Sequence, residues 1–318
     1  MLYLYILKRL VMTVVVVILV MTTLALLVHI VPGDPARVVL GQRSNPELEA
    51  LVRHEMDLDQ PVHVQLLHFF WNALHGDLGR DFFSRQPVVT LIGNALPHSV
   101  ILAVTSLALA VLLGVPLGVF AATRPNSWID RLLGIVSIST ISMPTYLAGL
   151  FLLLIFVVQF PLLPSIGTGT FADPLDYAVH LILPATALAL GWIGYLARLV
   201  RASMLEVLGA EYIRSFHAFG VRDSIIFNKY ALKNALIPTV AVLGVGLGNL
   251  MGGAVFIEVI FGRAGLGSLL YSAISQRNFP IVRGAVLVVA LLFIVANLLA
   301  DITYRLLDPR IRVERAGA

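Results

Sequence analysis

The chain has 318 residues, of which 58% are hydrophobic and only 13% are charged. A soluble domain carries about 25% charged residues, so this composition excludes a cytosolic enzyme and indicates several segments that face lipid. The sequence has no cysteine, which excludes disulfides, cysteine nucleophiles, thiolate zinc sites and iron–sulfur clusters. A net charge of +4 does not indicate a nucleic-acid partner.

Six apolar stretches are long enough to cross a membrane as helices. About 20 apolar residues span roughly 30 Å of hydrocarbon, where only helices and closed barrels satisfy every backbone group. The first stretch is longer than the apolar region of a signal peptide, so we interpret it as a retained span. The sequence therefore predicts an all-α membrane protein with six transmembrane helices, at 10–31, 99–123, 132–160, 178–199, 235–261 and 284–307.

The basic residues predict how the spans are oriented. If the N-terminus lies in the cytoplasm, fourteen of the twenty-two basic residues also lie inside. Long translocated segments count little in the positive-inside rule, so we expect both termini to be cytoplasmic. The residues expected inside are Lys8, Arg9, Arg124, Arg131, Arg198, Arg201, Arg214, Arg222, Lys229, Lys233, Arg305, Arg310, Arg312 and Arg315.

The predicted spans divide the chain into four parts. Residues 1–31 form an N-terminal segment with the first span, and residues 32–97 form a large external loop. Residues 98–307 form a five-helix core that includes a cytoplasmic loop at 200–234, and residues 308–318 form a cytoplasmic tail.

The external loop is expected to contain short amphipathic helices. Asn45-Pro46 resembles a helix cap followed by proline at the first helical position, and Pro61 starts a second candidate helix. Gly76 stands where that helix would end. We interpret the second helix as a lid that lies on the bilayer or caps the external mouth, in preference to a ligand site.

The cytoplasmic loop shows a helical pattern with Tyr212, Ile213, Phe216 and Phe219 apolar, interrupted by Gly220. A short helix with exposed apolar side chains and basic neighbours needs a protein surface to cover it. The alternative is a helix that lies flat in the lipid interface. The residues alone do not separate these two interpretations.

Glycines on the fifth predicted span favour close helix packing. Gly244, Gly248 and Gly252 recur every fourth residue, which places small residues on one helix face and lets another helix approach. Gly114 and Gly118 repeat this spacing in the second span. The approaching helix can belong to this chain or to a second membrane subunit.

Several kinds of chemistry are absent from the sequence. It contains no G-x-x-x-x-G-K-[ST] phosphate loop and no G-x-S-x-G nucleophile elbow, and its eight histidines show no convincing metal-ligand spacing. We therefore expect no catalytic residue, cofactor or metal site. Glu258 and Asp301 stand near span ends and are interpreted as interfacial or structural, so the spans offer no ion relay. If the protein moves a solute across the membrane, the energy must then come from elsewhere.

The cytoplasmic loop resembles the signature of permease subunits of binding-protein-dependent ABC importers, in the branch that handles peptides and nickel. The matching residues are Glu211-Tyr-Ile-Arg-Ser-Phe-His-Ala-Phe-Gly220 and Lys233-Asn234-Ala235-Leu236-Ile237-Pro238. Further stretches agree with this branch: Pro32-Gly33-Asp34-Pro35, Leu58-Asp59-Gln60-Pro61, Gly76-Asp77-Leu78-Gly79 and Asp308-Pro309-Arg310-Ile311-Arg312. Phe216, His217 and Phe219 depart from the usual pattern, which has alanine, a basic residue and lysine there.

This resemblance implies a pore subunit in the inner membrane of a prokaryote, with no enzymatic activity of its own. It implies a second homologous permease, two ATP-binding cassette ATPases and an extracytoplasmic binding protein as partners. Di- or oligopeptides are the expected substrates, and import of nickel or glutathione by the same architecture is an alternative. An alternative of another class is an ion-coupled transporter or channel that works without an ATPase. The expected ATPase-coupling residues are Glu211, Tyr212, Arg214, Phe216, Ala218, Phe219 and Gly220.

Overall fold

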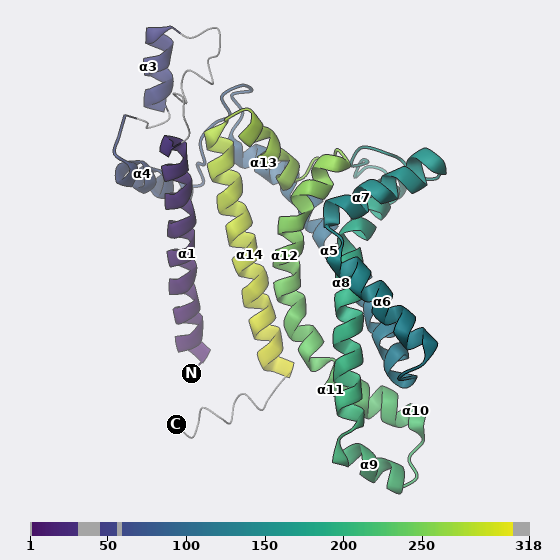
Figure 1. The fold of residues 1–318 in the computed structure, drawn as a ribbon. Coiled ribbons are helices and arrows are strands. Elements are labelled where there is room, and N and C mark those ends of the chain that lie inside the picture. Colours follow the sequence, from purple (N-terminus) through teal and green to yellow (C-terminus); the bar gives the residue numbers. More distant parts are fainter. Residues whose placement is uncertain (1, 31–44, 56–58, 308–318) are drawn as a thin grey trace. The chain divides into compact units, whose positions relative to one another are not determined.

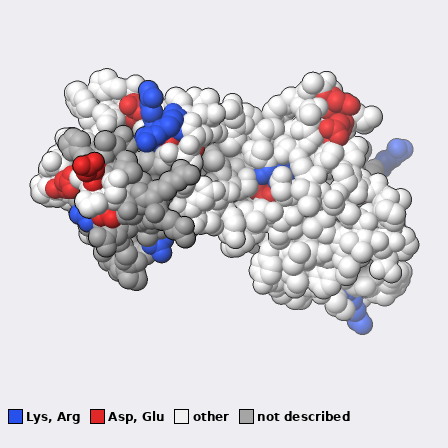
Figure 2. All heavy atoms as spheres, turned by 90° about the horizontal axis from the view of Figure 1, so that it is seen from above, with Lys and Arg blue, Asp and Glu red and all other residues white. Residues whose placement is uncertain are grey.

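The computed structural model describes residues 2–30, 45–55 and 59–307. Within these ranges every regular element is a helix, which confirms the all-α prediction (Figure 1). The chain forms two compact units: the described residues up to His98 with Ala264–Ile294, and Ser99–Arg263 with the described residues from Val295 onward. On the face shown in Figure 2, small groups of charged side chains are separated by wide uncharged areas, as the low charge content requires.

Four helices in the described part of the chain are long and apolar enough to cross a membrane. They are α5 (Val88–Thr123), α8 (Pro174–Leu208), α12 (Ile237–Ile260) and, within α14 (Phe279–Leu307), the segment Phe279–Leu299. A bent helix pair adds a fifth candidate. In the first helix, α1 (Leu2–Ile30), the apolar segment Val11–Leu26 is shorter than the candidate spans and is not counted among them. The total of six spans therefore remains a prediction.

The third predicted span, 132–160, was expected to be one continuous stretch, and this was wrong. Helix α6 (Trp128–Ser142) ends before Pro144, and α7 (Thr145–Leu153) continues into the π-helix η2 (Leu154–Gln159). The two halves meet at an angle of 104°. Proline lacks the N–H that a continuing helix needs and drives the residue before it out of the helical region, so Met143 is extended at φ −79° and ψ 122°.

In the first unit, two short helices begin at the positions that the sequence indicated. Helix α3 (Pro46–Glu55) starts at Pro46, and α4 (Val62–Leu74) follows Pro61. Gly76, just beyond α4, has φ +81°. Helix α5 begins at Val88, well before the expected start of the span at 99, so the predicted loop boundary at 97 falls inside this helix.

The first unit has two apolar clusters. In one, Val17 and Met21 of α1 pack with Leu287 of α14 and with the partly buried Phe69 and Phe70 of α4. The other joins the start of α5, helix α13 (Leu266–Ser275) and the start of α14, through Val88, Ile92, Ala95, Leu266, Ala273, Ile281, Val282 and Ala285. Helix α4 therefore packs on α1 through one face that includes its two phenylalanines, while Leu67, Trp71 and Leu74 are exposed.

A buried carboxylate fixes the loop between α4 and α5. Asp81 accepts hydrogen bonds from the backbone N–H groups of Phe83 (3.1 Å) and Ser84 (3.0 Å), from the Ser84 hydroxyl and from the Asn278 amide. Burial alone would raise the pKa of Asp81, but these hydrogen bonds outweigh it and lower the pKa below the usual value. The charged carboxylate therefore stabilises this loop at neutral pH, and the contribution is lost as the pH falls through the lowered pKa.

The second unit is organised around α8. This helix starts at an aspartate cap, where the Asp173 side chain accepts from the N–H groups of Leu175 and Asp176, and it packs against α6, α7 and α12. Below its end, Figure 1 shows helices α9 (Glu211–Ala218) and α10 (Asp223–Ile225), which belong to the loop predicted at 200–234. The π-helix η3 (Ile226–Ala231) and α11 (Leu232–Ala235) lead from there into α12.

Candidate functional site

Helix α9 has a defined start and end. Glu211 lies in its first turn, where a negative charge is favourable, and its last residues form a Schellman motif. The Val221 N–H donates to the Phe216 carbonyl (3.1 Å), and the Gly220 N–H donates to the His217 carbonyl (3.0 Å). Gly220 has φ +72°, a left-handed conformation that glycine adopts at no steric cost. Glycine is therefore favoured at position 220, because the chain turns there through a left-handed backbone conformation.

The predicted coupling residues fall into two groups. Six of them are exposed, namely Glu211, Tyr212, Arg214, Ala218, Phe219 and Gly220. Phe216 is half-buried, because its ring stacks on Tyr230 of η3 with centroids 4.3 Å apart. The ring of Phe219, in contrast, is 83% exposed. Phe216 thus contacts its own chain, and Phe219 is the phenylalanine available to a partner.

Three residues that were not among the predicted site residues hold α9 in place. Ile213 is fully buried in a cluster with Val200 and Met204 of α8 and Ile226 of η3. Tyr230 supplies the stacking surface for Phe216, and the Asn234 amide donates to the Tyr212 hydroxyl at 2.9 Å. The apolar pattern of the loop already included Ile213, but the contacts of Tyr230 and Asn234 depend on the folded loop. Helix α9 is consequently tied to α8, η3 and α11.

A buried ion pair joins α6 to α8. Asp130 accepts from Arg201 through both carboxylate oxygens, at 2.5 Å from Nε and 2.7 Å from Nη2, and also from the Asn126 N–H (3.0 Å). Ser127 caps α6 by accepting from the Asp130 N–H. Asp130 is buried, whereas the Arg201 side chain is 33% exposed. Sequence reasoning counted Arg201 only as a cytoplasmic charge, because 71 residues separate the two partners.

Two glycines of α5 allow a close approach to α8. A Cβ atom on Gly114 would lie 2.9 Å from the Ile193 carbonyl oxygen and 3.0 Å from the Leu196 Cβ. On Gly118 it would lie 2.6 Å from the Ala197 carbonyl oxygen and 2.8 Å from the Val200 Cβ. The helix that approaches this pair of glycines therefore belongs to the same chain.

We expect Gly118→Leu to lower the folded yield and the thermal stability of the detergent-solubilised protein. The side chain has no room between α5 and α8, and overpacking of this kind costs about 1–3 kcal/mol. Gly134→Ala is the matched control, because no atom outside its own helix lies within 4 Å of a Cβ there, and we expect it to be neutral or slightly stabilising. Equal yields for both variants would show that the α5–α8 contact is unimportant for folding.

The glycines of α12 have different surroundings. Gly248 is buried and Gly244 half-buried, but Gly252 is exposed, with nothing within 4 Å of a Cβ placed on it. Close packing on this helix also involves Gly246, which was outside the predicted face: a Cβ atom there would lie 2.9 Å from the Trp192 indole. The packing role of Gly244, Gly248 and Gly252 therefore remains a prediction.

Buried polar groups lie at the far end of α12 from α11. Glu258 is 1% exposed and accepts from the Ser99 hydroxyl at 2.5 Å. Arg263 donates to the His180 carbonyl and to the Tyr177 hydroxyl, each at 3.2 Å. This environment makes Glu258 a structural residue of the core; the side chain of Asp301 lies outside the described residues. The described part of the chain has no group of three or more histidine or carboxylate side chains that could hold a metal ion.

Two family models together match nearly the whole chain. The model described as "Binding-protein-dependent transport system inner membrane component" matches residues 114–313, and the N-terminal model of membrane components of such systems matches residues 1–103. Among solved structures, an inward-facing conformation of the MetNI methionine ABC transporter has a similar fold, with a TM-score of 0.57, 20% identity and coverage of 69% of this chain and 96% of that chain.

Curated relatives are similar over their full length. A protein of Brucella abortus named as a peptide transport system permease is 40% identical, over 97% of this chain and 99% of the relative. A glutathione transport system permease of Salmonella typhimurium is 36% identical, over 97% and 98% of the two chains. The chain therefore belongs to the family of inner membrane components of binding-protein-dependent transport systems: it is a multi-pass permease subunit of a prokaryotic ABC importer, a membrane pore component that works with a substrate-binding protein and an ATPase and is not itself an enzyme.

Proposed function

We propose that this chain forms, with a second homologous permease, the translocation pore of a peptide importer. The observation that carries the proposal is the full-length similarity to relatives named for peptide and glutathione transport, glutathione being a tripeptide. Both names indicate peptides as the substrate class. The exposed glycine of α12, Gly252, supports a second permease, because it leaves room for a helix that this chain does not provide in the described residues.

In this proposal α9 docks into a cleft on one ATPase subunit. Its outward side chains include Glu211, Arg214 and His217, so the exposed face is largely polar and unsuited to lie in lipid. Phe219 adds a large apolar side chain that a protein cleft could cover. The contacts of α9 with η3 and α11 connect it to α12, so movement of the ATPase would be transmitted to a membrane span.

The decisive experiment is to purify the tagged chain from its native membrane and to reconstitute the resulting complex in proteoliposomes with its binding protein. An ATPase and a second permease should co-purify, and ATP should drive uptake of labelled di- or tripeptides. Uptake of a small ion without ATPase would instead support the ion-coupled alternative, and ATP-driven uptake of nickel but no peptide would contradict the proposed substrate.

The orientation of the spans can be tested with reporter fusions. A reporter that is active only outside the cytoplasm should work when it is fused within residues 46–85, because this loop follows the first span. It should fail when it is fused next to Arg222 or after Arg312, where the basic residues are expected inside. Activity at all three positions would contradict the proposed topology.

A further inference from the structure

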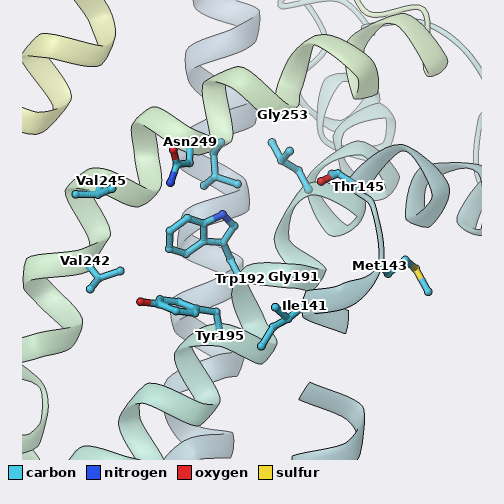
Figure 3. Close-up of a pocket in the computed structure, with 12 residues that line it drawn as sticks. Ile141, Met143, Thr145, Gly191, Trp192, Tyr195, Val242, Val245, Asn249 and Gly253 are labelled. Atoms are coloured by element: carbon cyan, nitrogen blue, oxygen red, sulfur yellow. The ribbon is translucent and has the colours of Figure 1, made fainter. Parts of the chain in front are cut away.

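The second unit contains a groove between α8, α12 and the break that separates α6 from α7. Its volume is about 440 Å³, which lies within the range of small-molecule sites. Met143 and Thr145 line it from the break between α6 and α7, Trp192 and Tyr195 from α8, and Asn249 from α12. Figure 3 shows the two aromatic rings of α8 reaching toward Asn249 and the valines of α12.

The groove is lined from the middle of two candidate membrane spans. Trp192 and Asn249 each stand near the middle of a candidate span, Pro174–Leu208 and Ile237–Ile260. Beside them the helical backbone is interrupted at Pro144, where Met143 is 37% exposed. A broken helix at this depth is tolerated only where it is buried in protein or lines a water-filled cavity.

Polar lining groups argue against lipid as the occupant. Asn249 is exposed at mid-span, and Tyr195 is 40% exposed one turn beyond Trp192. An amide or hydroxyl that faces hydrocarbon loses its hydrogen bonds to water, which is costly, so polar residues inside spans face a bundle interior or a wet cavity. The groove therefore faces water, a polar solute or another protein surface, and not lipid.

The lining also indicates the kind of solute. The twelve lining residues include aromatic, aliphatic and amide side chains but no charged one. The Asn249 amide can both donate to and accept from a peptide bond. The rings of Trp192 and Tyr195, 5.5 Å apart at an interplanar angle of 76°, offer flat faces to apolar side chains. Such contacts suit the brief passage of a peptide with uncharged side chains.

Gly246 explains how Trp192 keeps this position. The indole lies against the backbone of α12, and a Cβ atom on Gly246 would come within 2.9 Å of the ring. Any larger residue at 246 would displace the indole. Gly246 is thus a positioning residue for the wall of the groove.

We propose that this groove is the part of the translocation path that contacts the peptide at mid-membrane, and that Trp192 and Asn249 make the permease favour uncharged side chains. The proposal rests on the proposed function, since it assumes that peptides pass through this chain. Selection at this step would act after the binding protein has delivered the peptide.

Charge substitutions at Asn249 test the proposal in the reconstituted complex. The probes are alanyl-alanine, lysyl-alanine, glutamyl-alanine and phenylalanyl-alanine, each at a concentration that saturates the binding protein. Asn249→Asp should raise the uptake of lysyl-alanine over glutamyl-alanine at least about fivefold relative to wild type, and Asn249→Lys should shift the ratio in the opposite direction. Gln159→Glu, at the exposed end of η2 outside the groove, is the matched control and should leave the ratio unchanged.

The aromatic wall is tested in the same assay. Trp192→Ala should lower the uptake of phenylalanyl-alanine relative to alanyl-alanine about tenfold, as expected when an aromatic anchor is lost. The control is Trp128→Ala on α6, which is exposed and does not line the groove. ATPase activity stimulated by the binding protein shows in each case that the complex is assembled.

Two results would overturn the inference while leaving the proposed function intact. One is wild-type selectivity in all three groove variants, with the complex assembled and transporting peptides. The other is a specific loss of the second permease from complexes that carry the groove variants, which would make the groove a subunit interface. If the wild-type complex transports none of the four peptides, the proposed function itself fails.

Discussion

Replacing Arg201 with leucine should lower the free energy of unfolding by about 3 kcal/mol, because it leaves the buried carboxylate of Asp130 without its partner. Breaking a buried pair typically costs about 3–5 kcal/mol, and the partial exposure of Arg201 places this pair at the lower end. The bidentate geometry also fixes the start of α6 against α8, so the contact between the two helices should loosen. Denaturant titration in mixed micelles measures the change.

Arg198→Leu is the matched control for this prediction. It removes an exposed arginine from the same helix, and we expect a change within about 0.5 kcal/mol. The double variant Asp130→Ala with Arg201→Leu should regain part of the lost stability, because no unpaired charge remains buried. If Arg201→Leu is as stable as Arg198→Leu, the pair contributes nothing to the fold.

The second large effect is expected in transport. Gly220→Val places a β-branched residue at φ +72°, which costs roughly 1–2 kcal/mol in the left-handed region. No atom lies within 4 Å of a Cβ there, so this cost comes from the backbone alone and the turn after α9 should open. We expect ATP-driven uptake to be abolished while the protein still inserts into the membrane. Gly220→Asn, which tolerates this conformation, should retain uptake.

Phe216→Ala and Phe219→Ala distinguish the two phenylalanines of the loop. Phe219→Ala should leave the stability of the permease unchanged but weaken its binding to the ATPase by about 2 kcal/mol, roughly a thirtyfold change in affinity. Phe216→Ala should destabilise the loop itself, because it removes the stacking on Tyr230. Uptake and ATPase co-purification are measured on both variants. Normal values for both quantities in Gly220→Val and Phe219→Ala would refute the docking role of α9.

The amino-acid sequence alone determined the class of this protein. Its apolar stretches and scarce charge required lipid-facing helices, since few other structures satisfy a backbone in hydrocarbon. The motif from Glu211 to Pro238, together with the missing phosphate loop, indicated a permease that depends on a separate ATPase, and the family comparison confirmed the permease assignment. Signals of this kind are local: a run of apolar residues or a spaced motif can be recognised without knowing which residues meet.

Other features were decided only by the tertiary structure. The hydropathy of residues 132–160 did not indicate the bend at Pro144, because one proline hardly changes the mean hydropathy of a long apolar segment. The pairing of Asp130 with Arg201, the stacking of Phe216 on Tyr230 and the packing of Gly246 against Trp192 each join residues of different helices. Helix periodicity shows which residues share a face, but the partner of that face depends on how the helices pack. The groove beside Trp192 and Asn249 is formed by several helices, so the sequence alone could not predict it.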